Sequence, residues 1–477
     1  MKGLAALILI LILTGPAQAQ DLSTRIDATV EAGDLARAHW GIHVIDAASG
    51  ADVYARNADR LFVPASVLKL VVAAAGAHYL GGDYAWQTRV LAAGPVVGGE
   101  LRGDLVLHGS GDPAISGRFT DGMLDILQMW ADSLAAHGVH RISGTIVADQ
   151  TLWDAQLRSH DWELYDANWW YAAPVAPLGF NDNAIDFRVA AGEPGEPARI
   201  TWEPEDAGFV FLNRTRTVPA GAEYTLDFDR LPGSDTIFAY GQIPVDARVQ
   251  TEYFAVRDPG EYLAAVLRAV LEGRGIDVAN DAVSAVYAPA ASPAADAAHL
   301  FTWRGPPLPR AMSPILLTSQ NWFAEQLNKT IGLEVKGEGS WEAGLTAAAE
   351  FLSNVVGIDS AAYELRDASG LSSSNLITPR ALTTLLRHVH GGELHAMLQP
   401  GISVSGESGS LRNRFSDLPG RVAAKTGSIR HVSSLAGSVR TDSGRTLVFA
   451  IMANNTGVSG SLASRAIDDV VRALAAL

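Results

Sequence analysis

Pro64-Ala65-Ser66-Val67-Leu68-Lys69 begins an apolar, alanine-rich run of the sequence that continues to Leu80. The run predicts a buried helix over Ala65–Leu80, with Pro64 near its first position, where the missing N–H costs little. Ser66 and Lys69 are three residues apart, so a helix places them on one face. A serine hydroxyl is a poor nucleophile until a base takes its proton, and lysine serves as that base when burial or a second cation destabilises its ammonium. The stretch therefore predicts a nucleophilic serine with a lysine base.

Two further motifs follow in the chain. Ser319-Gln320-Asn321 fits S-x-N, and Lys425-Thr426-Gly427 fits K-T-G. Each motif alone is common, whereas the three in this order, followed by two apolar strand patterns, indicate an active-site-serine enzyme. If the motifs converge, Lys425 is the second cation beside Lys69. The alternatives are a surface position for Lys69, and capping of the following helix by Ser319 and Asn321.

Residues 421–428 are predicted to form a strand at a sheet edge. Alternation along the strand directs Lys425 and Gly427 to one side and Thr426 to the other. Gly427 then allows a substrate backbone to lie close to the strand. We expect the N–H groups of Ser66 and Ser428 to form an oxyanion hole, in which the loss of one donor costs roughly a hundred- to a thousandfold in rate.

Composition excludes several other kinds of site. The absence of cysteine excludes a thiol nucleophile and thiolate metal sites. Twelve histidines leave a Ser-His-Asp enzyme open, but there is no G-x-S-x-G motif, and His431 is interpreted as a solvated strand residue. Without an H-E-x-x-H or paired-carboxylate motif, neither a metal nor a cofactor is predicted. The net charge of −16 disfavours nucleic acid as a partner.

Residues 1–19 have the layout of a secretory signal. Lys2 supplies a positive charge, an apolar run extends from Leu4 to Thr14, and Ala17-Gln18-Ala19 offers small residues for cleavage. The run is shorter than the roughly twenty residues of a membrane-spanning helix, so an uncleaved anchor is the weaker alternative. We expect cleavage after Ala19, export to the periplasm and no transmembrane span in the mature chain.

Strand and helix patterns can be read along most of the chain. A hairpin is predicted at Trp40–Asp46 and Asp52–Arg56, two strands at Val432–Val439 and Thr446–Ala453, and an amphipathic helix at Leu462–Leu477. Further helical patterns cover residues 23–37, 260–274 and 310–356, and the last of these has a break near Gly337–Ser340. Between residues 92 and 286, short strand-like runs alternate with turns.

Together these features resemble the class C low-molecular-mass penicillin-binding proteins, which are serine D-Ala-D-Ala carboxypeptidases and endopeptidases of the bacterial periplasm. The resemblance extends over essentially the whole mature chain and includes a long insertion between the first two motifs. Beyond the three motifs it rests on Gly103-Asp104-Leu105-Val106, Ser110-Gly111-Asp112-Pro113, Asn181-Asp182-Asn183, Asp367-Ala368-Ser369-Gly370-Leu371-Ser372 and Gly409-Ser410-Leu411.

The resemblance implies an acyl-enzyme mechanism on peptidoglycan stem peptides, with β-lactam antibiotics as covalent inhibitors. Ser66 would be acylated with Lys69 as its base, and Ser319 would pass the proton to the leaving amine. Asn321 would bind the substrate amide, and Lys425 and Thr426 would hold the terminal carboxylate of D-Ala-D-Ala. Whether the enzyme acts as a carboxypeptidase, a D,D-endopeptidase or both is left open.

The same resemblance implies an α+β fold. A β-lactamase/transpeptidase-like domain, an antiparallel sheet flanked by helices, would be assembled from residues 20–92 and 290–477. A large, mostly β insertion would occupy residues 93–289, with a nested smaller domain near residues 190–250.

Three positions depart from the family pattern. Gln320 replaces the Asp of S-D-N, Ala368 replaces a Gly of D-G-S-G-L-S, and Ser373 stands where a basic residue often follows. None of these changes removes an atom that the chemistry needs. They leave the side-chain preference for the stem peptide open.

Two other functions are weighed against the peptidase. Serine β-lactamases are the nearest, but their chains are shorter and lack the insertion. Glu325-Gln326-Leu327-Asn328 superficially resembles the segment that carries the deacylating Glu of class A lactamases; it is interpreted as helix surface, so slow deacylation of penicillin is predicted. The other alternative is a non-catalytic wall-binding or sensor protein of the same fold, against which the intact motif residues argue.

Overall fold

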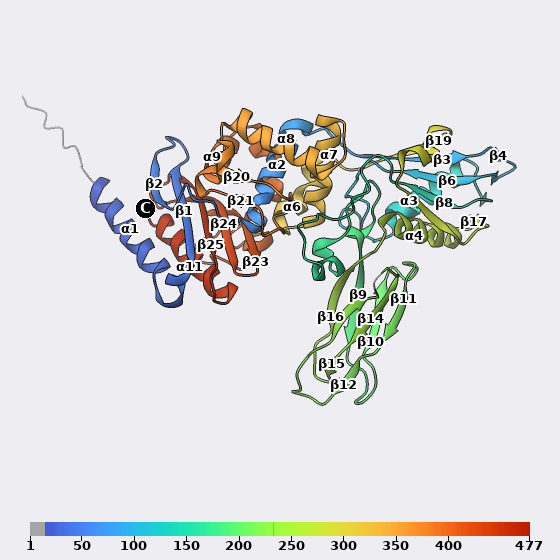
Figure 1. Ribbon diagram of the computed structural model, residues 1–477, viewed down its shortest axis with the longest axis horizontal. Helices are drawn as coiled ribbons and strands as arrows, with labels where there is room; N and C mark the ends of the chain where they lie inside the picture. Colours follow the sequence, from blue (N-terminus) through green and yellow to red (C-terminus); the bar gives the residue numbers. More distant parts are fainter. Residues whose placement is uncertain (1–14, 232) are drawn as a thin grey trace, which may run out of the picture. The chain divides into compact units, whose positions relative to one another are not determined.

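The computed structural model describes residues 15–231 and 233–477 (Figure 1). Residues 1–14, which form most of the predicted signal, lie outside the described residues, and α1 spans Gly15–Val30. The chain folds into two compact units. The first unit contains the residues up to Val67 together with Leu376–His390 and Ser403–Leu477, and the second contains Leu68–Asn375 and Gly391–Ile402.

A six-stranded sheet forms the centre of the first unit. Its strand order is β2-β1-β25-β24-β23-β22, and all neighbouring strands are antiparallel. The predicted hairpin and the two predicted carboxyl-terminal strands are confirmed. The strands are β1 (His39–Asp46), β2 (Asp52–Arg56), β22 (Ser403–Val404), β23 (Val422–Ile429), β24 (Val432–Arg440) and β25 (Thr446–Asn454), and the unit also holds the short strand β21 (Leu376–Ile377).

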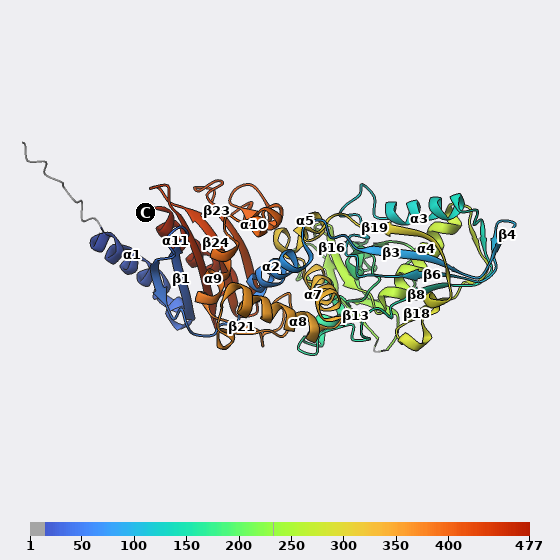
Figure 2. The same cartoon turned by 90° about the horizontal axis from the view of Figure 1, so that it is seen from above.

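Helices cover both faces of this sheet (Figures 1 and 2). Ile42 and Val44 of β1 share an apolar core with α1 and with α11 (Gly460–Ala475). His43, between them, bonds Thr383 of α9 (Pro379–Val389) through its Nδ1 at 2.5 Å. Because successive strand residues face opposite sides, α1 and α11 lie on one face and α9 lies on the other. The expected antiparallel sheet flanked by helices is confirmed, although the helix predicted over residues 23–37 ends at Val30 and is followed by a 3-10 turn.

The helices of the second unit pack around α7 (Asn321–Lys336), which contacts α2 (Lys69–Leu80) and α8 (Trp341–Glu350). The helix predicted over Ala65–Leu80 begins as a 3-10 turn at Ala65–Leu68, and α2 proper starts at Lys69. The break predicted near Gly337–Ser340 is confirmed, because the left-handed Gly337 ends α7 and Ser340 caps the start of α8. The helical pattern at 310–356 is also interrupted at Pro314. The remaining pieces are α5 (Leu308–Ala311), α6 (Ser313–Leu317) and a π-helical turn at Phe351–Val356, and α10 (Glu393–Leu398) also belongs to this unit.

A five-stranded mixed sheet with the order β18-β8-β6-β3-β19 lies in the second unit, where α4 (Pro259–Gly273) packs on β8 and β18 and α3 (Asp125–Ala136) packs on α4. A smaller sheet has the order β17-β7-β5-β4. The larger sheet extends beyond residues 93–289 on both sides, and the division of the chain at those boundaries stays a prediction. The strands are β3 (Gln87–Ala93), β4 (Val96–Val97), β5 (Glu100–Leu101), β6 (Asp104–His108), β7 (Arg141–Ile142), β8 (Ile146–Asp149), β17 (Asp277–Val278), β18 (Val283–Val286) and β19 (Ala298–Arg304), with β20 (Tyr363–Glu364) elsewhere in the unit.

Three small sheets of the second unit are built from β9 to β16, with the orders β10-β9-β16, β11-β14-β13 and β12-β15. Phe187 lies at the centre of an aromatic cluster with Trp202, Phe211, Phe228 and Phe254. The nested domain near residues 190–250 stays a prediction. The strands are β9 (Ala184–Ala190), β10 (Arg199–Glu203), β11 (Val210–Asn213), β12 (Arg216–Val218), β13 (Asp227–Arg230), β14 (Thr236–Tyr240), β15 (Gln242–Pro244) and β16 (Gln250–Ala255).

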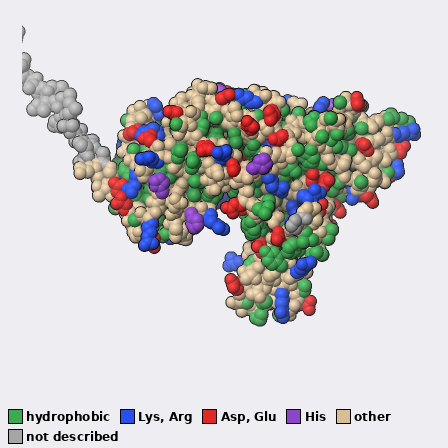
Figure 3. Space-filling view, in the orientation of Figure 1, with side chains coloured by type: hydrophobic (Ala, Val, Ile, Leu, Met, Phe, Trp, Pro, Cys, Tyr) green, Lys and Arg blue, Asp and Glu red, His purple; other side chains and the backbone are tan. Residues whose placement is uncertain are grey.

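The surface is charged but not of a single sign. Figure 3 shows acidic and basic side chains interspersed over the visible face. In the part of the chain that the structure describes, no helix combines the length and the apolar character needed to cross a membrane.

Candidate active site

The predicted nucleophile, Ser66, lies in the 3-10 turn Ala65–Leu68. Ala65, directly before it, has a φ of 51°, in the left-handed region that alanine rarely adopts. The Pro64 carbonyl accepts a hydrogen bond from Ser434 Oγ of β24 at 2.6 Å, which ties this turn to the sheet. Backbone strain of this kind persists only where the surroundings impose it, and it is concentrated at functional sites.

Gly427 of β23 lies against the same turn. A Cβ on Gly427 would lie 2.2 Å from Ser434 Oγ and 2.9 Å from both Pro64 O and Ser66 N. Gly427 is predicted from the sequence to make room for a substrate backbone. On the side of the strand where a Cβ would stand, this interpretation is wrong, because the backbone that carries Ser66 occupies that space. Glycine is required here because the turn and the strand approach each other so closely.

The K-T-G strand presents an open edge. β22 pairs only with Ala423 and Ala424 of β23, and among the described residues no further strand lies on that side. Lys425 is buried, and its Nζ donates to the Thr426 carbonyl at 2.7 Å. Thr426 Oγ1 donates to Ser410 Oγ at 2.9 Å, which links the K-T-G motif to the Gly409–Leu411 turn. Ser428, next along the strand, is exposed.

Lys69 is the first residue of α2 and is completely buried. Its Nζ donates to Asn321 Oδ1 and to the Ser369 carbonyl, each at 2.6 Å. Burial lowers the pKa of Lys69 to about 7, although the negative charges of Asp367 and Glu325 act in the opposite direction. The alternative of a surface lysine is wrong. A lysine with a pKa near neutrality can exist as the free amine, which is the form that accepts a proton.

The S-x-N motif immediately precedes and begins α7. Ser319 has a φ of 61°, and the side chain that caps the helix belongs to Gln320, whose Oε1 accepts from Trp322 N at 3.3 Å. The alternative in which Ser319 and Asn321 cap the helix is therefore wrong, because Gln320 is the capping residue and Asn321 is the first residue of α7. Gln320 Nε2 also donates to Asp182 Oδ2 at 2.7 Å. An aspartate at position 320 could not donate this bond, which gives a physical reason for the departure from S-D-N.

Asn321 connects Lys69 to the aromatic part of the second unit. Its Oδ1 accepts from Lys69 Nζ, while its Nδ2 donates to the Tyr171 carbonyl at 2.7 Å. Both ends of the amide are therefore fixed. Nearby, Trp322 Nε1 donates to the Pro174 carbonyl, and Lys329 Nζ donates to Asp154 Oδ1 and the Gln156 carbonyl. Residues 154–174 are thus attached at several points along α7.

Two buried carboxyl groups lie near Lys69, and neither of them was assigned a role beside that lysine from the sequence. Glu325 of α7 is fully buried, so its interpretation as helix surface is wrong. It accepts hydrogen bonds from the backbone N–H groups of Ala368 and Ser369. Asp367 is also fully buried and accepts from Trp162 Nε1 at 3.0 Å. The signature Asp367–Ser372 pointed to this loop, but nothing in the sequence indicated that Glu325 would bind it.

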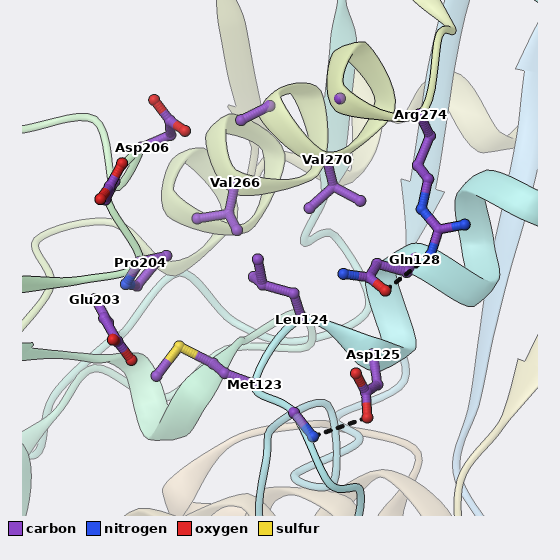
Figure 4. A pocket seen from close by; sticks show the side chains of 14 residues that line it. Met123, Leu124, Asp125, Gln128, Glu203, Pro204, Asp206, Val266, Val270 and Arg274 are labelled. Atoms are coloured by element: carbon purple, nitrogen blue, oxygen red, sulfur yellow. Dashed lines mark hydrogen bonds between the residues drawn. The ribbon is translucent and has the colours of Figure 1, made fainter.

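The structure thus brings the predicted residues together in two groups, each within one compact unit. Ser66, Lys425, Thr426 and Ser428 belong to the first unit, and Lys69, Ser319 and Asn321 belong to the second. None of these residues lines the pocket of about 630 Å³ between α3 and α4 that Figure 4 shows. Among the described residues, no group of three or more His, Asp or Glu side chains is placed to hold a metal ion.

Known proteins resemble this chain in sequence and in fold. The family model described as D-Ala-D-Ala carboxypeptidase 3 (S13) matches residues 22–477. The chain is 34% identical over 469 residues to a D-alanyl-D-alanine carboxypeptidase of Actinomadura sp. (strain R39), covering 95% of this chain and 84% of the relative.

Two solved structures share the fold. Penicillin-binding protein 4 of Haemophilus influenzae is 21% identical and superposes with a TM-score of 0.82, covering 96% of this chain and 99% of the other. A penicillin G-acylated predatory endopeptidase of Bdellovibrio bacteriovorus is 16% identical with a TM-score of 0.52, covering 91% of each chain. With the family model matching almost the whole sequence, the chain belongs to the D-Ala-D-Ala carboxypeptidase 3 (S13) family, the class C low-molecular-mass penicillin-binding proteins.

Proposed function

We propose that Ser66 is the acylated nucleophile of a serine-type D-Ala-D-Ala carboxypeptidase or D,D-endopeptidase that acts on peptidoglycan stem peptides. The observation that carries the proposal is Lys69, a fully buried amine whose pKa is lowered to about 7, three residues from a serine held in a strained turn. Membership of the S13 family supplies the substrate class.

In the proposed reaction the neutral amine of Lys69 takes the proton of Ser66 Oγ as that oxygen attacks the carbonyl carbon between the two D-alanines. The oxyanion that forms is stabilised by the N–H groups of Ser66 and Ser428. The proton passes through Ser319 to the leaving amine as the C–N bond breaks, and water then hydrolyses the ester to free Ser66. Asn321 binds the substrate amide, and Lys425 and Thr426 hold the terminal carboxylate.

Fluorescent penicillin separates this proposal from its alternatives. A stable adduct on a denaturing gel is expected, because the carboxyl group of Glu325 is engaged by three N–H donors and is therefore not poised to activate a deacylating water. Rapid loss of the label would indicate a β-lactamase, and a complete lack of labelling would exclude both enzymes. Release of D-Ala from a pentapeptide, compared with cleavage of cross-linked muropeptides, then divides carboxypeptidase from endopeptidase.

The rate of acylation is expected to rise with pH and to level off above an apparent pKa near 7. Burial lowers the pKa of Lys69 to about 7, so below that pH the ammonium dominates and cannot accept the Ser66 proton. The measurement is the rate constant for labelling by fluorescent penicillin over a pH range that brackets neutrality. A rate constant that is flat or falls with increasing pH across this range would contradict the role of Lys69.

Replacing Gly427 with alanine is expected to slow acylation by roughly a hundredfold, since a displacement of about 1 Å at the reacting atoms can cost that much. The added Cβ would stand 2.9 Å from Ser66 N, so the turn that carries the nucleophile must move. Gly460→Ala is the matched control, because nothing lies within 4 Å of a Cβ there. The labelling rate and the melting temperature are measured for both variants, and an unchanged rate in Gly427→Ala would show that the close approach is not needed.

The protein is proposed to act in the periplasm after removal of residues 1–19. The apolar run and the Ala17-Gln18-Ala19 sequence support this proposal. Sequencing of the amino terminus of the protein recovered from the periplasmic fraction tests it, with Gln20 as the expected first residue.

A further inference from the structure

We propose that Glu325 is a positioning residue for the base. It fixes the backbone of Ser369, and the carbonyl of that residue holds the amine of Lys69. The inference rests on the proposed function, because it assigns a role within that reaction. It concerns α7, α2, the loop Asp367–Ser372 and their hydrogen-bond partners, all of which belong to the second compact unit.

Both carboxyl oxygens of Glu325 face hydrogen-bond donors. Oε1 accepts from Ser369 N at 2.8 Å and from Ala368 N at 3.2 Å. Oε2 accepts from Trp341 Nε1 at 2.9 Å and from Ala368 N at 3.1 Å. An amide in this place would turn its NH₂ group toward an N–H in either orientation, so only a group that accepts at both oxygens fits.

A second carboxylate, that of the first loop residue Asp367, binds backbone N–H groups farther along the same loop. Asp367 Oδ1 accepts from Gly370 N at 2.7 Å and Oδ2 accepts from Ser372 N at 2.7 Å. Asn375 Nδ2 and Trp162 Nε1 complete its partners. Four backbone N–H groups of the loop are thus bound by two carboxyl groups, and the Ser369 carbonyl is the group that receives Lys69 Nζ at 2.6 Å.

The hydrogen bonds of Lys69 Nζ orient its amine. Lys69 Nζ donates to Asn321 Oδ1 and to the Ser369 carbonyl. The first is fixed by Tyr171, and the second is fixed by Glu325 through the Ser369 N–H. When both acceptors are rigid, the direction of the nitrogen lone pair is set before substrate arrives, which is the preorganisation that proton transfer needs.

The charge of Glu325 acts on the same amine. The charged groups that face Glu325 are Lys69, Asp367 and Lys329. Burial and the neighbouring Asp367 raise the pKa of Glu325, whereas its bonds from Ser369 and Ala368 lower it. In its ionised form Glu325 raises the pKa of Lys69, so removal of the charge should lower the pKa of Lys69 further.

The test compares the pH dependence of labelling by fluorescent penicillin in three variants of the full chain. Glu325→Gln is expected to lose roughly tenfold to a hundredfold in rate at neutral pH, as a misplaced catalytic group does, and to move the acid limb of its pH profile to lower pH. Trp341→Phe removes the Nε1 donor to Glu325 Oε2 and keeps the carboxyl group of Glu325. A smaller loss of labelling rate than in Glu325→Gln is therefore expected. Glu334→Gln is the matched control, because it makes the same change at an exposed position of the same helix.

The outcomes separate this inference from the proposed function. If the unaltered protein is not labelled, the proposed function fails. If it is labelled and Glu325→Gln matches it in rate and in pH profile, the positioning role fails while the function stands. A lower rate with an unmoved acid limb, together with a lower melting temperature, indicates only a loss of structure and overturns the inference. A lower rate with a displaced acid limb in a folded protein supports it.

Discussion

Replacing Ser66 with alanine is expected to abolish covalent labelling by penicillin and the release of D-Ala. The acyl-enzyme is an ester of Ser66 Oγ, so without that oxygen no adduct survives denaturation. The fold should persist, because alanine suits a 3-10 turn whose Pro64 carbonyl is held by Ser434 and not by the Ser66 side chain. The measurements are gel fluorescence after incubation with labelled penicillin and D-Ala release from a pentapeptide.

Ser461→Ala is the control for that experiment. Ser461 is an exposed serine near the start of α11 in the same compact unit, so it repeats the chemical change away from the motifs. It should be labelled like the unaltered protein. Persistent labelling of Ser66→Ala at a comparable rate would place the nucleophile elsewhere in the chain.

Replacing Lys69 with methionine is expected to lower the acylation rate constant by about a hundred- to ten-thousandfold, the contribution that a positioned general base typically makes. Methionine is unbranched and fills the buried channel of the lysine without an amine. The acid limb of the pH profile should disappear together with the rate, because the group that titrates near neutrality is gone.

Folding must be checked in this variant, because Asn321 Oδ1 and the Ser369 carbonyl lose their donor. Circular dichroism and the melting temperature provide that check. Lys336→Met is the control, since Lys336 is an exposed lysine at the end of α7 that pairs with Glu350. A folded Lys69→Met protein that retains most of the acylation rate would show that another group is the base.

Much of the first unit could be predicted because its signals are local. The hairpin of β1 and β2 alternates around a turn, and β24 and β25 are apolar runs bounded by turn residues. The motif residues were found for a similar reason, since each motif is contiguous in sequence. The buried state of Lys69 followed from the apolar residues around it in α2.

The environment of α7 could not be predicted because its polar residues do not face water. A helix with Asn321, Glu325, Gln326 and Lys329 is typical of an amphipathic surface helix. In the structure all residues from 321 to 332 are buried, and these polar side chains bond to backbone groups of distant segments. The partners of a buried polar residue depend on tertiary contacts, which periodicity does not report.

Two backbone features were also beyond the sequence. Ala65 adopts a positive φ without the glycine or asparagine that usually signals one. Gly427 was correctly singled out as a place of close approach, but a glycine does not reveal which segment approaches it. Both positions depend on how the turn at Ser66 meets β23 and β24, and that contact joins residues far apart in the chain.

The attachment of residues 154–174 along α7 has a consequence for how this enzyme could be shortened. Tyr171 supplies the acceptor for Asn321, and Trp162 supplies a donor to Asp367. A gene trimmed to encode only the segments that carry the three motifs would therefore expose buried amide and carboxyl groups without partners beside the base. Residues 154–174 are therefore not a detachable accessory, because the polar groups that surround the base depend on them for partners.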